Sequence, residues 1–116
     1  MRDTIAAIEG EYRRYRALAE GALAQVENEA LHVPAPGGGN SLAALVRHIG
    51  GNLKSRFTDF PTSDGEKAWR DREGEFAARD ATRADLEALW REGWETLSAA
   101  LEPLTDADLG RTVAIR

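Results

Sequence analysis

Prolines and glycines divide this chain into a few long windows, and their positions constrain its fold more than any other feature. The prolines are Pro34, Pro36, Pro61 and Pro103, and three consecutive glycines occupy positions 37–39. Proline lacks a backbone donor and glycine loses much conformational entropy, so both are disfavoured inside helices. The windows between them are long enough for helices of several turns, and each can be tested for a helical period.

The first window has a clear helical period. From Ile5 to Ala30 the apolar residues recur every three or four positions, which predicts an amphipathic helix over residues 4–30. Composition favours the same class of structure, because the chain has 20 alanines and 12 leucines but only 8 isoleucines and valines. Alanine and leucine lose little side-chain freedom in a helix, whereas β-branched residues lose more.

A second helix is predicted over residues 41–60. Asn40 or Ser41 is suited to the N-cap, since its side-chain oxygen can accept a hydrogen bond from the first turn. Pro61 disfavours the helical conformation at the residue before it and so ends the helix.

A third helix is predicted over residues 82–102, before Pro103. Thr82 and Asp85 are spaced like a capping box at its start. Gly93 lies on the apolar stripe, where glycine is less stable than alanine by about 1 kcal/mol. We therefore expect a neighbouring helix to approach closely at Gly93.

Residues 61–81 show no sustained period, and a connection of this length is uncommon in a compact domain. Charges of both signs are mixed over residues 64–80, which is typical of a solvated loop, with a docking site as the alternative. Trp69 and Phe76 are the only large apolar residues in the connection. We expect these two rings to dock on the helices and to anchor the loop.

The C-terminal region predicts one short turn and an extended tail. Thr105 and Asp108 have capping-box spacing, Gly110 ends the turn, and residues 111–116 read as an extended segment. An isolated strand is not stable, and three amphipathic helices leave a groove where a fourth would fit. The pattern therefore predicts an all-α array that lacks a fourth helix, which a partner or residues beyond position 116 would supply.

Composition restricts the classes of function. The chain of 116 residues has the size of a single domain, 1–116. Its net charge of -5 gives nucleic acid no electrostatic reason to bind. No apolar stretch could span a membrane, and the N-terminus carries charge where a signal peptide is apolar, so we expect a soluble cytoplasmic protein. Without cysteine, any metal must be held by histidine, aspartate or glutamate.

One polar face of the second helix carries side chains that could bind a ligand or take part in a reaction. His48 shares this face with Ser41, Asn52, Ser55 and Asp59, at helical spacings away from the apolar stripe. His48 is either a surface histidine or a metal ligand, and a fourth helix over this face would favour the ligand, since a buried imidazole needs a partner.

The other candidate motifs are weak. His32 follows the first helix, where its ring would pack or cap carbonyl groups rather than take part in chemistry. No serine lies in a glycine-flanked nucleophile turn. The glycines at 37–39 lack the lysine and hydroxyl residues of a phosphate-binding loop.

Three strings carry a family likeness: NSLAALVRHIGGNLKSRFTDF at 40–60, TSDGEKAWRDREGEF at 62–76 and ADLEALWREGWETLSAALEPLTDADLGRTVAIR at 84–116. They resemble the DinB-like superfamily, most closely a branch of small bacterial proteins of unknown function. The resemblance implies an up-down-down-up four-helix bundle, often dimeric, with a divalent metal such as zinc or nickel held by three histidines. His48 matches the first of these ligands. The other two would lie on a last helix, beyond the residues present here.

This resemblance leaves two functions open. The first is a dimerising helical module, a homodimer with an incomplete metal site and little or no bound metal. The second is a metal-dependent hydrolase or thiol-dependent transferase that acts on an unknown small molecule, once ligands from outside this chain complete the site. In that case Asn52 or Asp59 would support the metal-bound His48.

Overall fold

The computed structural model of the protein describes residues 1–77 and 80–113, and all the regular structure in these residues is helical. The α-helices are α1 (Asp3–Ala24), α2 (Leu42–Phe57), α3 (Arg72–Ala77) and α4 (Arg83–Leu101). Two short 3₁₀-helices, η1 (Asn28–Ala30) and η2 (Asp106–Gly110), follow α1 and α4. The predicted all-α class is confirmed.

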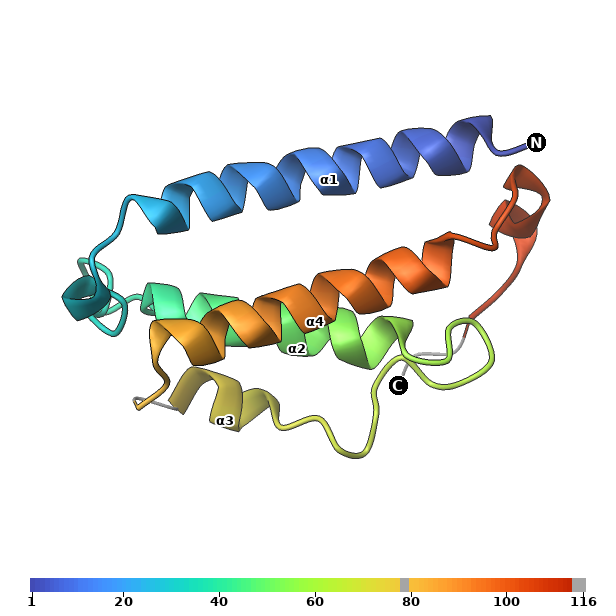
Figure 1. Ribbon diagram of the computed structural model, residues 1–116. Coiled ribbons are helices and arrows are strands. Elements are labelled where there is room, and N and C mark those ends of the chain that lie inside the picture. The colour runs from blue at the N-terminus through green and yellow to red at the C-terminus, as the bar shows by residue number, and fades with distance from the viewer. Residues whose placement is uncertain (78–79, 114–116) are drawn as a thin grey trace.

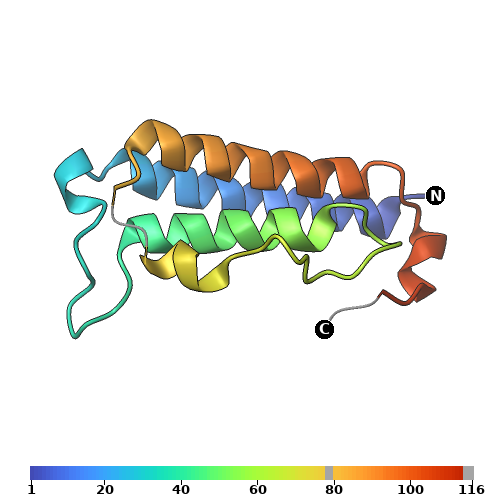
Figure 2. The same ribbon diagram turned by 90° about the horizontal axis from the view of Figure 1, so that it is seen from below.

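The three long helices lie side by side, and α3 packs against α2 (Figures 1 and 2). α1 runs opposite to α2, whereas α2 and α4 run in the same direction. The connection that contains α3 returns the chain along α2 to the start of α4. This arrangement places Gly65, Lys67 and Glu75 of the connection next to the polar face of α2.

The first helix is shorter than the predicted range 4–30, because α1 ends at Ala24. The guanidinium of Arg83 donates hydrogen bonds to the carbonyl oxygens of Leu23 and Val26, so groups left unpaired at the helix end are satisfied from α4. After the bend at η1, Leu31 is only 2% exposed in the core. Burial of Leu31 thus favours ending the helix early.

The second helix begins as predicted and ends three residues early. The Ser41 hydroxyl accepts a hydrogen bond from the Ala44 backbone, which confirms Ser41 as the N-cap. Thr58 is the C-cap, and Asp59 has a positive φ of 53°, a conformation that cannot continue an α-helix. Asp59 therefore lies outside α2.

α2 and α4 make the closest helix pair of the fold. A Cβ placed on Gly93 would lie 2.9 Å from the carbonyl oxygen of Gly50, and a Cβ on Gly50 would lie 3.0 Å from the carbonyl oxygen of Leu89. The predicted close approach at Gly93 is confirmed. Partly buried residues of α1, such as Tyr12 and Leu23, pack against a core of buried side chains from α2, α4 and the segments that precede them: Leu31, Ala43, Val46, Leu53, Ala81, Leu86, Trp90, Trp94, Leu97 and Leu101.

α4 begins at the predicted N-cap, since Thr82 and Asp85 form the reciprocal hydrogen bonds of a capping box. Thr105 and Asp108 form a second capping box at η2, which ends at Gly110 as expected. Of the predicted extended tail, residues 111–113 have no regular secondary structure, and residues 114–116 lie outside the described part.

The termini of α1 and α4 are joined by reciprocal hydrogen bonds. Asp106 accepts from the backbone N–H groups of Thr4 and Ile5 at 3.1 and 2.9 Å, and so caps α1 from η2. Arg2 donates to the carbonyl oxygens of Leu104 and Leu101 at 2.6 and 3.0 Å. Each helix end thereby supplies the partners that the other end lacks.

None of the helices in the described residues is long and apolar enough to cross a membrane.

Candidate functional site

His48 meets the connecting segment on the polar face of α2. Its Nδ1 lies 3.3 Å from Oε1 of Glu75, and its ring centroid lies 4.7 Å from that of Phe76. Both partners belong to α3. The His48 side chain remains 32% exposed, so the ring is held by α3 without being enclosed.

A buried arginine fixes the carboxylate that faces His48. The Arg70 side chain is only 2% exposed, and its Nε and Nη2 lie 3.3 Å from Oε2 and Oε1 of Glu75. Arg70 Nη1 lies 3.5 Å from Glu66 Oε1, within ion-pair range. A charge this deeply buried needs paired partners, so Arg70 and Glu75 hold each other in one geometry.

Gly51 provides the space for this carboxylate. A Cβ at Gly51 would lie 1.9 Å from Glu75 Oε2, far closer than two non-bonded atoms can approach. Glu75 therefore lies directly against the backbone of α2, one turn along from His48. Any other residue at position 51 would displace the carboxylate.

Polar groups also anchor the segment before α3. The buried Ser55 hydroxyl donates to the Gly65 carbonyl at 2.7 Å and accepts from the Lys67 backbone at 3.1 Å. Lys67 Nζ in turn donates to the carbonyl oxygens of Ser55, at 2.7 Å, and of Asp64. The connection is thus held to α2 by hydrogen bonds with defined directions.

The expected aromatic anchoring is wrong for Trp69, which is 53% exposed and has Lys54 Nζ over its ring, 5.3 Å from the centroid. Phe76, 36% exposed, does pack on the His48 ring. The expectation of a fully solvated loop fails as well, because Arg70 and Glu75 are buried. The short helix α3 was not predicted, since six residues are too few to show a period.

The hydrogen bonds indicate which nitrogen of His48 carries the proton. A carboxylate can only accept, so Nδ1–H donates to Glu75. Arg70 Nη2 lies 3.4 Å from Nδ1 but also 3.3 Å from the same carboxylate oxygen, to which it donates. Within the described residues Nε2 has no hydrogen-bond partner. In the neutral imidazole this arrangement leaves Nε2 as the acceptor or ligand atom.

The other candidate residues lie apart from this cluster. Asn52 is half-buried one turn further along α2. Asp59 is exposed beyond the end of α2, and its carbonyl oxygen accepts from the backbone of Thr62 and Ser63. His32 Nε2 lies 2.7 Å from the carbonyl oxygen of Ala81, which precedes α4, and so contacts a different helix end from the one expected.

The described residues around His48 do not supply a complete set of metal ligands. Among the described residues no group of three histidine, cysteine, aspartate or glutamate side chains could hold a metal ion. His48 by itself has the features of one ligand: an Nε2 without a partner and an Nδ1 bonded to a carboxylate, as in many metal-bound histidines. The described part of the chain thus fits one ligand of a metal site and no more.

Fold and site together define a class: an all-helical protein that presents one oriented imidazole between a long helix and a short one. The chain belongs to the family described as Protein of unknown function (DUF1572), whose model matches residues 2–116. No curated protein and no solved structure matches the chain.

Sequence reasoning identified His48 but missed Arg70, Glu75 and Gly51. The connection carries one usable signal: charged residues of both signs stand between two aromatic residues, a pattern that suits a buried ion pair as well as a solvated loop. Nothing in the sequence distinguishes these two outcomes.

Proposed function

We propose that this chain is a DinB-like helical-bundle protein that contributes His48 as one ligand of a divalent metal site. In this proposal α1, α2 and α4 are three helices of an up-down-down-up bundle. The remaining ligands and the fourth helix lie outside the described residues.

The observation that carries this proposal is the hydrogen bond from His48 Nδ1 to a buried, arginine-paired carboxylate. In metal-bound histidines, the ring nitrogen that does not bind the metal donates to a carboxylate or carbonyl oxygen. This hydrogen bond fixes the tautomer and the ring orientation and raises the basicity of the histidine. Glu75 of α3 would take this role, and Gly51 leaves the space for its carboxylate.

A divalent ion held there would activate a bound water or thiol for attack, the chemistry of a hydrolase or a thiol-dependent transferase. This chain's own residues would do the positioning: Glu75 holds the imidazole, and Arg70 holds Glu75. Phe76 covers one face of the His48 ring and limits the access of water to it.

Metal binding by the purified chain tests the proposal. With one imidazole at the site we expect substoichiometric zinc and nickel by elemental analysis, because imidazole supplies much of the preference for these ions. Titration with paramagnetic Ni²⁺ should broaden NMR signals around His48 first. His48→Ala should abolish this broadening, and His32→Ala should leave it unchanged.

The supporting carboxylate is tested in the same titration. Glu75→Gln should weaken the binding at His48 by about 10–100-fold, the usual effect of losing such a partner. Glu73→Gln, an exposed glutamate of the same short helix, is the matched control. A full equivalent of tightly bound metal in this chain, or binding that survives His48→Ala, would contradict the proposal.

We also propose that this chain forms a homodimer through apolar residues that its helices leave exposed. α1 exposes Tyr15 and Leu18, which are 58% and 60% accessible, and α2 exposes Leu45 and Ile49 at 40% and 38%. Each pair lies on one face of its helix. A second copy offers the same surface, as an isologous two-fold interface requires.

Light scattering at several protein concentrations tests the dimer. We expect a mass of two chains that Leu18→Glu and Ile49→Glu reduce to one. Val33→Glu is the control, because Val33 is similarly exposed at 59% in a connecting loop. A monomer mass at every concentration would refute this interface.

A further inference from the structure

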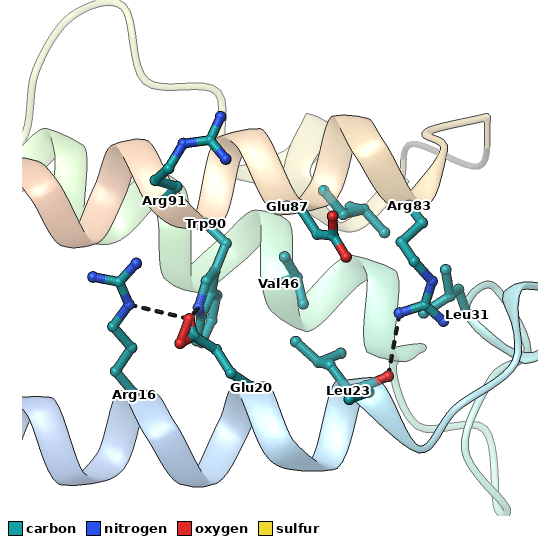
Figure 3. Close-up of a pocket in the computed structure, with 11 residues that line it drawn as sticks. Arg16, Glu20, Leu23, Leu31, Val46, Arg83, Glu87, Trp90 and Arg91 are labelled. Atoms are coloured by element: carbon teal, nitrogen blue, oxygen red, sulfur yellow. Dashed lines mark hydrogen bonds and ion pairs between the residues drawn. The ribbon is translucent and has the colours of Figure 1, made fainter.

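A cavity of about 290 Å³ lies between α1, α2 and α4 (Figure 3). Leu23 of α1 and Val46 of α2 point into this space, and Trp90 reaches across it from α4 toward α1. Leu31 and Leu86 complete its apolar walls. An apolar cavity of about 150 Å³ is already large enough to bind benzene. This larger cavity therefore has room for a molecule of two fused rings.

The hydrogen-bonding groups at the two ends of the cavity already have partners within the protein. At one end Trp90 Nε1 donates to Oε2 of Glu20 at 3.3 Å, and the same oxygen accepts from Arg16 at 3.1 Å. At the other end Arg83 donates to the backbone at the end of α1, including the Leu23 carbonyl at 3.2 Å. These side chains bridge α1 and α4 and need no ligand to satisfy them.

The other charged residues of the lining stand at the surface. Glu87 and Arg91 are exposed, carry opposite charges and lie one turn apart on α4. An ion that entered the cavity would exchange its hydration shell for apolar side chains, which is costly in free energy. The walls and the rim together therefore favour a ligand that is neutral and apolar.

We propose that this cavity binds a small neutral hydrocarbon-like molecule, about the size of naphthalene. Such a ligand would remove apolar surface from water and would contact the Trp90 ring, Leu23 and Val46. Cavities that hold small organic ligands begin at about this size and are mostly apolar. The cavity is formed by residues other than the His48 cluster, so this site is separate from the one proposed above.

Binding of naphthalene to the 116-residue chain tests the site, with naphthoate and naphthylmethylammonium as probes of similar shape and opposite charge. The readouts are calorimetry and the NMR signals of the indole N–H groups of the three tryptophans. We expect one naphthalene per chain, with a shift of the Trp90 signal and none of the exposed Trp69 signal. Naphthalene should bind at least about tenfold more tightly than either ion, because the ions lose hydration.

Variants on one face of α1 locate the ligand. Ala24 is exposed and lines the cavity, so Ala24→Phe should fill part of the space and abolish the shift of the Trp90 signal. Ala17→Phe is the matched control, because Ala17 is an exposed alanine two turns earlier on the same face and outside the cavity lining. Glu87→Gln should leave the affinity for naphthalene unchanged, since a neutral ligand makes no use of the carboxylate.

Several outcomes would overturn the proposal. Equal or tighter binding of either ion would show that the site selects charge, and several naphthalene molecules per chain with an equal shift of Trp69 would show non-specific adsorption. Unchanged affinity in Ala24→Phe would place the ligand elsewhere. The absence of saturable naphthalene binding would refute the site itself.

Discussion

At the scale of single residues, two adjacent residues of the connection differ sharply in how deeply they are buried. Trp69 and Arg70 are adjacent, yet the tryptophan is 53% exposed and the arginine side chain only 2%. Tryptophan is usually buried more than arginine. Here the order is reversed because Arg70 has two carboxylate partners, Glu66 and Glu75, beside α2. The ion cluster, rather than the aromatic ring, therefore fixes the connection.

Arg70→Met should destabilise the protein by about 3–5 kcal/mol, because it leaves the buried Glu75 carboxylate without its charge partner. Trp69→Ala should change the free energy of unfolding by less than about 1 kcal/mol, as exposed substitutions usually do. Urea unfolding followed by circular dichroism measures both. If Trp69→Ala proved the more damaging change, the ring would be an anchor after all.

At the scale of helices, glycines have opposite effects in different places. Gly93 lies where α2 and α4 cross, and its missing side chain lets the Gly50 backbone approach. Gly21 lies in α1, where an added Cβ would meet no atom within 4 Å. The same residue type thus permits close packing in one helix and only weakens the other.

Gly21→Ala should stabilise the protein by about 0.4–1 kcal/mol, because alanine restricts the unfolded chain and favours the helix. Gly93→Ala should destabilise it by about 1–3 kcal/mol, since the new methyl group forces α2 and α4 apart. Thermal unfolding of both variants gives the comparison. A stabilised Gly93→Ala variant would mean that the helices can separate without loss.

At the scale of the whole molecule, residues near the two ends of the chain hold α1 and α4 together. Hydrogen bonds from the Ile5 and Thr4 backbone, the first being the larger cause, lower the pKa of Asp106 below its ordinary value of 3.8. Asp106 thus stabilises the folded protein in its charged form. That contribution is complete above pH 3.8 and is lost as the pH falls through the lower folded pKa.

Asp106→Asn should lower the thermal midpoint at neutral pH. It should also reduce the decrease of the thermal midpoint that the unchanged protein shows below pH 3.8. Part of the dependence should remain, because a backbone hydrogen bond from Thr105 also lowers the pKa of Asp108. Melting curves from pH 2 to 7 measure this, with Asp80→Asn as the control. Parallel curves for Asp106→Asn and the unchanged protein would exclude the proposed cap.

The sequence alone determined the three long helices, the caps at Ser41 and Thr82, and the close approach at Gly93. These features depend on residues within one or two turns of each other, so a periodic pattern is enough to predict them. His48 was also predicted as a candidate, but only as a residue on a polar face.

Only the tertiary structure decided where the helices end and what surrounds His48. Arg83 ends α1 from across the fold, and Asp106 caps it from the other terminus. Glu75 reaches His48 across 27 positions of sequence. Such contacts depend on the path of the connecting chain, and a mixed-charge segment can satisfy its charges with water or with a buried partner. In this fold Glu75 pairs with the buried Arg70, because Gly51 leaves room for the carboxylate against α2.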